Sequence, residues 1–282
     1  MKKMLFSCLT AAIILVCSSC TPAGYPVEFG QTKISSPPKR VVCLGEQAAS
    51  WVSYLGYGEF LVGAPEIIIE SDKLTATDIG TPLNIYKETV VSLKPDLVIT
   101  SFALESDFSN TLREKEVPVI TFENPKDFKE LEEYFKQIIK LFEGEKQTAK
   151  KFEEKNSAFN ASVTEIKNQI SGVQKNALVF LEEGFAATGD TFSGSVLKAF
   201  GIKNVGENGK NYKLSNEEVT AQNTDIIFCK KGMGDMLIKN EAFKDITAVK
   251  NAKVYEVDTT GLVVGGAKMF SAVGQITNYL KK

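Results

Sequence analysis

The chain has 282 residues and nearly balanced charge, with 33 basic and 35 acidic side chains. That balance excludes the strongly basic surface of a nucleic-acid-binding protein. The sequence contains no histidine, which excludes histidine-based nucleophilic triads and removes the commonest ligand of zinc and other transition metals. We therefore expect no nucleic-acid partner and no resident metal.

The first 19 residues have the pattern of a secretory signal peptide. Two lysines precede a mostly apolar run, Leu5–Val16, and small residues lead to Cys20. The run is shorter than the roughly 20 residues that a membrane-spanning helix needs. The segment before Cys20 resembles a bacterial lipobox, although Cys17 stands where leucine is usual. We expect residues 1–19 to be removed and Cys20 to carry a lipid; the alternative is an ordinary cleaved signal and a soluble product.

Residues 20–31 are interpreted as a lipid-anchored tether, because this stretch contains two prolines, two glycines and no apolar periodicity. No later stretch is apolar enough to span a membrane, so the rest of the chain is expected outside the cytoplasm, anchored to a bacterial membrane by the N-terminal lipid. Loss of residues 1–19 removes two lysines and no acid, which leaves 31 basic and 35 acidic side chains and a net charge of −4. The remaining 263 residues exceed a typical single domain, which predicts two lobes.

Residues 32–125 alternate between short apolar runs and helical patterns. Three runs are interpreted as buried strands, at Arg40–Leu44, Leu97–Thr100 and Val117–Ile120, and a helical pattern over Gln47–Leu55 follows the first of them. Continuous apolar strands that alternate with helices are typical of a parallel sheet covered on both faces. This segment is therefore predicted to form an N-terminal α/β lobe.

Residues 126–170 contain almost no turn residues and repeat apolar positions at helical spacing. Gly144 divides the segment into helices expected at about 127–142 and 146–170. At about 1.5 Å per residue, the second helix would be roughly 38 Å long, which is about the width of a small domain. One apolar stripe on an otherwise polar surface indicates a rigid helical spine between two lobes. A coiled-coil partner helix is not favoured, because the stripe lasts too few heptads.

The α/β alternation resumes over residues 171–282, where strands are expected at Asn176–Leu181, Asp225–Cys229 and Lys253–Val257, and a terminal helix at Met269–Leu280. This segment is predicted to form a C-terminal α/β lobe. As a whole, the sequence predicts an α/β fold in which a single long rigid α-helix joins two Rossmann-like lobes with mostly parallel sheets. A ligand in such a pair binds at the carboxyl ends of the strands, between the lobes.

Several motifs, spread in order over roughly residues 37–280, carry a resemblance to a known family. They are Pro38–Leu44, Leu55-Gly56, Leu61–Gly63 and Thr89–Ile99 in the first half, and Gly189–Gly194, Leu214–Val219 and Ala248–Tyr255 in the second. This ordered set resembles the substrate-binding lipoproteins of ABC importers for iron siderophores, haem and vitamin B12, which are class III periplasmic binding proteins. The resemblance implies the same two-lobe architecture that the periodicity predicts.

The resemblance also implies a function. It predicts a monomeric extracytoplasmic lipoprotein, without enzymatic activity or cofactor, that captures an iron chelate (a siderophore or haem) or cobalamin between its lobes. The protein would deliver this ligand to the permease and ATPase of the transporter. Two alternatives stay open, namely direct binding of a metal ion or oxyanion for import, and a ligand-sensing surface lipoprotein. An enzyme is not favoured, because the sequence lacks both histidine and a Gly-x-Ser-x-Gly elbow.

Two glutamates take roles that the resemblance implies. In this family an exposed glutamate on each lobe pairs with arginines of the permease and orients the binding protein over the pore. Glu88 and Glu217 hold these two positions in the sequence. The alternative is that both are only helix-start acids, which the exposed N–H groups and the dipole of a helix N-terminus favour.

Ligand-binding residues are expected where strands end at the cleft, with aromatic side chains that could stack on a planar ligand. Glu46 stands where the family commonly has proline, so it is either an acid of the cleft or a helix N-terminal carboxylate. The predicted ligand-binding residues are Glu46, Gln47, Ser101, Phe102, Phe185, Thr191, Phe192, Tyr212, Lys230 and Met233.

Cys43 and Cys229 are expected at strand ends, one in each lobe, too far apart in the pattern to favour a disulfide. Together with Met233, Met236 and Met269, their sulfur atoms would select a soft metal such as Cu(I). The interpretation that we favour is that both cysteines are small buried apolar residues.

Overall fold

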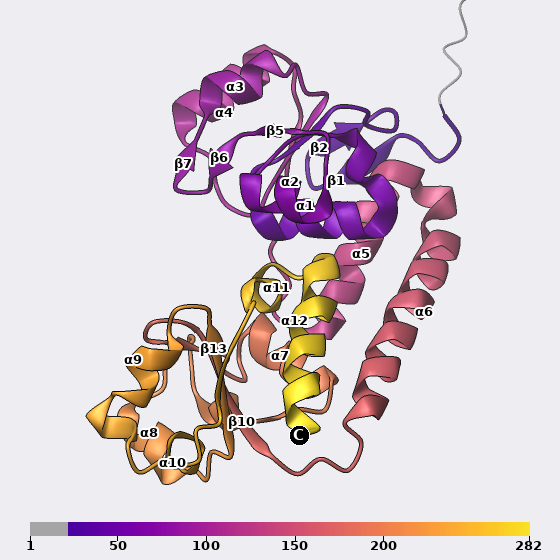
Figure 1. Ribbon diagram of the computed structural model, residues 1–282. Helices are drawn as coiled ribbons and strands as arrows, with labels where there is room; N and C mark the ends of the chain where they lie inside the picture. The colour runs from indigo at the N-terminus through magenta and orange to yellow at the C-terminus, as the bar shows by residue number, and fades with distance from the viewer. Residues whose placement is uncertain (1–21) are drawn as a thin grey trace, which may run out of the picture.

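A computed structural model describes residues 22–282 of the chain. The expected signal peptide, residues 1–19, and the expected lipidation site, Cys20, lie outside the described residues. Figure 1 shows two lobes connected through helices α5 (Phe128–Glu143) and α6 (Glu145–Gln169), with α6 running along one side of both. Within residues 22–282, no helix combines the length and the apolar character that crossing a membrane requires.

The N-terminal lobe is built on a five-stranded parallel sheet in the order β5-β4-β3-β8-β9. Every residue of the two central strands β3 and β8 is buried, because both faces of the sheet are covered. The strands are β3 (Val41–Cys43), β4 (Leu61–Ala64), β5 (Thr77–Asp78), β8 (Leu97–Thr100) and β9 (Val119–Thr121). The α-helices are α1 (Glu46–Val52), α2 (Glu66–Asp72), α3 (Lys87–Ser92) and α4 (Ser106–Glu114). Two hairpins complete the lobe: β1 (Val27–Phe29) pairs with β2 (Thr32–Ile34), and β6 (Gly80–Thr81) pairs with β7 (Asn84–Ile85).

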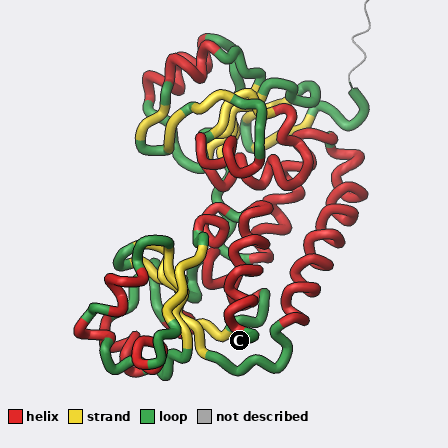
Figure 2. Tube along the Cα trace, viewed as in Figure 1, coloured by secondary structure: helices red, strands yellow, loops and turns green. Residues whose placement is uncertain are grey.

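The C-terminal lobe has a second five-stranded sheet in the order β11-β10-β13-β14, with β12 also paired to β10. All of its pairings are parallel except that of β10 with β11. The strands are β10 (Asn176–Glu182), β11 (Phe185–Ala186), β12 (Lys203–Asn204), β13 (Ile226–Lys230) and β14 (Val254–Val257). The helices are α7 (Phe192–Ala199), α8 (Asn216–Ala221), α9 (Gly234–Ile238), α10 (Thr247–Lys250), α11 (Thr260–Val264) and α12 (Gly266–Leu280). Figure 2 shows the strands of the two lobes as separate groups, with helices between them.

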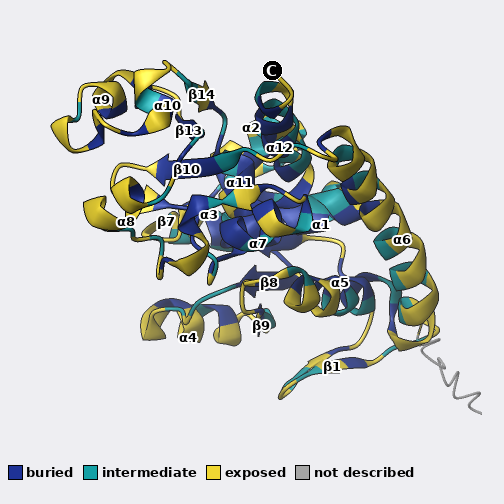
Figure 3. Cartoon of the chain, turned by 90° about the horizontal axis from the view of Figure 1, so that it is seen from below, coloured by how far each residue is buried: buried dark blue, intermediate teal, exposed yellow. Residues whose placement is uncertain are grey.

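The helical segment consists of α5, with 16 residues, and α6, with 25 residues. Asp127 caps α5, because its side chain accepts a hydrogen bond from the backbone N–H of Glu130 at 2.8 Å. Gly144 has φ 77 and separates the two helices at the predicted residue. Most of α6 is exposed (Figure 3), and its stripe of inward residues includes the buried Phe159 and Val163. The long helix therefore packs on the molecule through one narrow face, as its sequence predicts.

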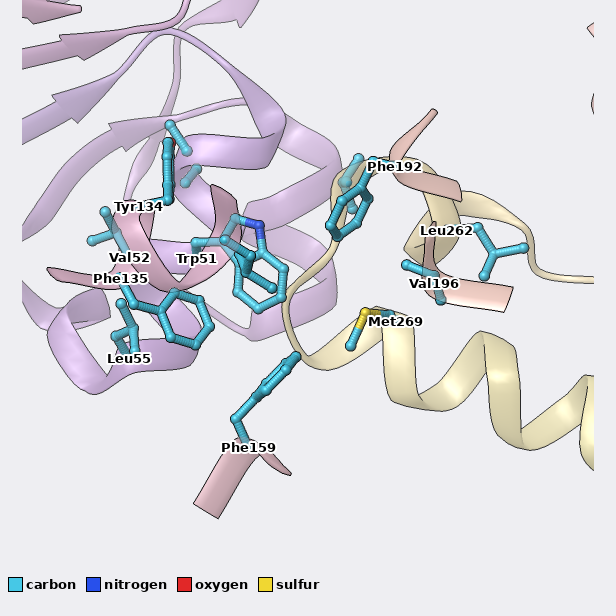
Figure 4. Close-up of a cluster of buried hydrophobic side chains, with 14 of the residues drawn as sticks. Trp51, Val52, Leu55, Tyr134, Phe135, Phe159, Phe192, Val196, Leu262 and Met269 are labelled. Atoms are coloured by element: carbon cyan, nitrogen blue, oxygen red, sulfur yellow. The ribbon is translucent and has the colours of Figure 1, made fainter. Parts of the chain in front are cut away.

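The two lobes share one hydrophobic core, which is centred on Trp51 of α1. The Trp51 ring makes edge contacts with Phe135 of α5 at 5.1 Å, Phe159 of α6 at 6.1 Å and Phe192 of α7 at 6.3 Å between centroids (Figure 4). Gly265 lies so close to Trp51 that an added Cβ would stand 2.4 Å from its ring. The lobes are therefore packed directly against each other behind the cleft, in addition to their connection through the helices.

Candidate functional site

A cavity of about 400 Å³ lies between the lobes at the carboxyl ends of the strands. This is where a pair of α/β lobes is expected to bind a ligand, and the volume falls in the usual range for small-molecule sites. Both lobes contribute to its lining. The N-terminal lobe and the start of the helical segment supply Gly45, Glu46, Gln47, Pro82, Ser101, Asn124, Pro125 and Lys126, and the C-terminal lobe supplies Asp190, Thr191, Phe192, Asn211, Tyr212, Val263 and Val264.

Three predicted ligand residues of the N-terminal lobe line this cavity, namely Glu46, Gln47 and Ser101. Glu46 and Gln47 are the first residues of α1, which is separated from the end of β3 by two residues, and Ser101 directly follows β8. Glu46 therefore occupies a helix N-terminus and a wall of the cavity at once. Its carboxylate is half-buried and has no hydrogen bond or ion pair to another of residues 22–282. It is available to a ligand, whereas the buried Gln47 presents less surface.

Three more predicted residues line the cavity from the C-terminal lobe, namely Thr191, Phe192 and Tyr212. Thr191 caps α7 through a 3.3 Å hydrogen bond from the Gly194 N–H to its hydroxyl, so its side chain is engaged in the protein itself. Phe192 is buried and packs on Trp51, in the contact between the two lobes behind the cleft that is centred on Trp51. We call this contact the joint. Tyr212 is half-buried on the 210–213 turn and is the more accessible of the two aromatic side chains.

The other four predicted ligand residues lie outside the cavity. Phe102 packs against the buried cluster on one face of the N-terminal sheet, and Phe185 is 44% exposed on β11. Lys230 forms an ion pair with Glu182 of the neighbouring strand β10. Met233 is buried in a separate hollow of the C-terminal lobe, about 410 Å³ in volume, beside Phe180 and Phe243. A strand end fixes where a loop begins but not the direction in which its next side chains turn, so the structure does not bring these four residues to the cavity.

Several cavity residues were not predicted from the sequence. Asp190 stands in the Gly189–Gly194 motif, which carries the family resemblance, and Lys126 precedes Asp127, the cap of α5. Val263 is 45% exposed and contributes apolar surface, and Leu83 is fully exposed on the β6–β7 hairpin, beside the lining residue Pro82. An isolated polar residue in a long loop carries no periodic signal, so sequence reasoning could not select these positions.

The charges of the cavity are two carboxylates, Glu46 and Asp190, and one ammonium group, Lys126. Hydrogen bonds from the Thr188 hydroxyl and the Asn211 N–H hold the pKa of Asp190 below its usual range, so this carboxylate stays ionised. Burial, and secondarily the charge of Asp190, raise the pKa of Tyr212. The phenol is therefore protonated and can donate a hydrogen bond to a ligand.

Cys43 and Cys229 are both buried and reduced, and neither lines the cavity. Burial raises the pKa of the Cys43 thiol, and burial together with Glu256 raises that of Cys229 to about 11. Protonated thiols are poor metal ligands. Among residues 22–282, no three cysteine or acidic side chains are grouped as metal ligands. The geometry favours the interpretation of both cysteines as buried apolar residues over a Cu(I) site.

Glu88 and Glu217 are exposed residues in the first turns of α3 and α8. Both helices lie on the side of the molecule opposite α6 (Figure 1). The neighbouring Glu218 is engaged in a capping box with Ser215, and Lys87 pairs with Glu105. In contrast, neither Glu88 nor Glu217 has an ion pair within residues 22–282. One free carboxylate is thus presented by each lobe.

Residues 41–260 match the family model described as periplasmic binding protein. The chain belongs to this family. Its relatives include the ABC transporter substrate-binding lipoprotein YvrC of Bacillus subtilis (strain 168), 23% identical over 86% of this chain and 80% of the relative. Another is the Fe(3+)-citrate-binding protein YfmC of the same organism, 25% identical over 82% of this chain and 76% of the relative. The family and the function predicted from the sequence, a substrate-binding protein of an ABC importer, are thereby confirmed.

Solved structures of the same fold support the predicted architecture. The periplasmic haem-binding protein RhuT from Roseiflexus sp. RS-1 has a TM-score of 0.70 at 19% identity, over 86% of this chain and 97% of that protein. The periplasmic vitamin B12-binding protein BtuF of Vibrio cholerae has a TM-score of 0.64 at 19% identity, over 87% and 98% of the two chains. The predicted fold class, two α/β lobes with a long helix, is confirmed.

Proposed function

We propose that this family member captures an iron chelate, haem or cobalamin in the interlobe cavity and delivers it to a membrane permease. The observation that carries the proposal is a small-molecule-sized cavity at the carboxyl ends of both sheets, lined by free polar groups and by an accessible tyrosine. The relatives named for ferric citrate, haem and vitamin B12 support this ligand class. In this proposal the protein works as a monomer outside the cytoplasm, tethered through lipid on Cys20.

The lining chemistry favours a complexed ligand over the alternatives of an oxyanion or a bare metal ion. The lining contains two carboxylates and a single lysine, and this charge balance disfavours the binding of a small oxyanion. Glu46 and Asp190 lie on opposite lobes, and Asp190 is already hydrogen-bonded to Thr188 and Asn211. A chelate supplies the metal ligands itself and needs only shape, apolar surface and hydrogen bonds from the protein. Tyr212 and Val263 offer that apolar surface.

The test of ligand class uses the only tryptophan of the chain, Trp51, as an intrinsic reporter. Haemin, ferric citrate, a ferric trihydroxamate and cyanocobalamin all absorb light, so binding of any of them in the cavity quenches Trp51 emission. We expect saturable quenching by one of these four at micromolar concentration or below. Saturable binding of free ferric ion or molybdate, with none of the four chelates bound, would contradict the proposal.

Docking on the permease is assigned to Glu88 and Glu217, which are exposed and have no ion pair within residues 22–282. Their helices, α3 and α8, lie on the same side of the molecule (Figure 1). We expect the double variant Glu88→Ala with Glu217→Ala to abolish ligand uptake by cells while the purified protein keeps its ligand affinity. The matched control replaces two exposed glutamates of α6, Glu153 and Glu165, with alanine, and uptake should persist. Normal uptake by the Glu88/Glu217 variant would refute the assignment.

A further inference from the structure

The turn that carries Tyr212 has an unfavourable backbone for this residue. The Lys213 N–H donates to the Lys210 carbonyl at 2.9 Å, and the two residues pair as an antiparallel bridge. Between them, Asn211 has φ 51 and Tyr212 has φ 64. Positive φ at both central residues is the pattern of a type I′ turn, in which the second position strongly prefers glycine. A bulky side chain in this conformation is strained. The chain therefore holds a tyrosine where glycine would be relaxed.

A hydrogen-bond relay beneath the turn holds it in this conformation. The hydroxyl of Thr188 donates to Asp190 Oδ1 at 2.7 Å and accepts from the Tyr212 N–H at 3.0 Å. Asp190 Oδ2 accepts from the Asn211 N–H at 3.0 Å, and the Tyr212 carbonyl accepts from the Ala186 N–H at 2.7 Å. The N–H groups of both central residues and the Tyr212 carbonyl thus have partners on the 186–190 segment.

Close packing fixes the relay itself. Thr188 is fully buried, and an added Cβ on Gly194 would stand 2.0 Å from its carbonyl oxygen. An added Cβ on Gly209 would stand 2.6 Å from Thr188 Cγ2. Thr188 therefore cannot move away from the turn, and loss of its hydroxyl would leave the Tyr212 N–H without its partner.

From this geometry we propose that Thr188 and Asp190 are positioning residues, which hold the Tyr212 side chain against the interlobe cavity as a preformed ligand contact. Retained backbone strain is common at binding sites, because the surrounding structure imposes it. A contact that is fixed before binding loses less conformational entropy when the ligand arrives. The proposal rests on the proposed function, since it assumes that the cavity binds a ligand.

The first test needs no ligand. The protein is labelled with fluorotyrosine, and the fluorine NMR signal of Tyr212 is assigned by its absence from Tyr212→Phe. Thr188→Val keeps the side-chain volume but removes the hydroxyl, so we expect the Tyr212 signal to shift or broaden. Thr188→Ser keeps the hydroxyl, so its Tyr212 signal should match that of the native protein. An unchanged Tyr212 signal in folded Thr188→Val would overturn the proposal. If Thr188→Val does not fold, Asp190→Ala, at an exposed site, is the second variant, and an unchanged Tyr212 signal in it would overturn the proposal in the same way.

The second test is a double-mutant cycle on affinity, with haemin, ferric citrate, a ferric trihydroxamate and cyanocobalamin as probes. We expect Thr188→Val to weaken the bound probe about tenfold in the native background and to change nothing further in Tyr212→Ala, because its effect passes through Tyr212. Equal losses in both backgrounds, or a lower melting temperature with unchanged affinity, would overturn the proposal. If no probe binds, the proposed function fails for these ligands, while the NMR result still decides whether the relay positions Tyr212.

Discussion

The joint behind the cleft depends on Gly265, and Gly265→Ala should destabilise the protein strongly. Gly265 has φ 75 and ψ −144, a region that side-chain-bearing residues rarely adopt, and forcing alanine there costs about 1–3 kcal/mol. The new Cβ would also stand 2.4 Å from Cζ2 and 2.6 Å from Cε2 of the buried Trp51. Overpacking of a rigid core costs a further 1–3 kcal/mol or so. We therefore expect a loss of about 2–6 kcal/mol in the free energy of unfolding.

The measurement is urea denaturation followed by the fluorescence of Trp51, which is the only tryptophan and lies at the joint itself. With an m-value of about 3 kcal/mol/M, the unfolding midpoint should fall by about 0.7–2 M. The matched control is Gly274→Ala in α12, where an added Cβ meets nothing within 4 Å. Helix propensity predicts that this control gains about 0.5–1 kcal/mol. Equal midpoints for the two variants would refute the account of the joint.

Three further predictions concern single groups. Cys43 and Cys229 are buried, and burial raises the pKa of both thiols. In a protein produced from residue 22 onward, we therefore expect neither thiol to react with a disulfide reagent until denaturant is added. Rapid labelling of the native protein would contradict this. Asp127→Ala removes the cap of α5 and should cost about 1 kcal/mol by urea denaturation, whereas Asp127→Asn should cost much less. Because the pKa of Asp190 is lower in the folded protein than its usual value of 3.8, its contribution to stability is present above that value and is lost as the pH falls through the folded pKa. The difference in the free energy of unfolding between the native protein and Asp190→Asn should therefore be constant at neutral pH and shrink below about pH 4. A difference that grows on acidification would contradict this prediction.

Much of the architecture was predictable because its signals are local and periodic. The buried runs at Val41–Cys43 and Leu97–Thr100 are continuous apolar strands, as parallel sheets require, and Gly144 interrupts an otherwise helical pattern. The ends of these strands then located the cleft, since parallel strands end at the same edge. Six of ten predicted ligand residues line the cavity, and three of them, Glu46, Gln47 and Ser101, do so because they come shortly after β3 and β8.

The unpredicted features depend on contacts between segments that are distant in the sequence. Gly265 is an ordinary glycine in the sequence, and its role appears only when Trp51, over 200 residues earlier in the chain, is packed against it. Lys230 lies outside the cavity because it pairs with Glu182 on the neighbouring strand, and Met233 because its turn leads into a separate hollow. Pairing across a sheet and the exit direction of a loop are tertiary properties, and neither has a periodic signature.

The cavity and the joint share residues, which limits how the protein can respond to a ligand. Phe192 and Val264 line the cavity, yet Phe192 also packs on Trp51 and Val264 directly precedes Gly265. Ser50 adds a hydrogen bond across the joint, from its hydroxyl to the Gly265 carbonyl at 3.3 Å. A large closure of the lobes would have to break this packing, because close-packed cores do not deform continuously. The stiffness expected from α6 is thus reinforced by the core itself, so we expect a ligand to be accommodated by side chains within a fixed frame, in agreement with the proposed positioning of Tyr212.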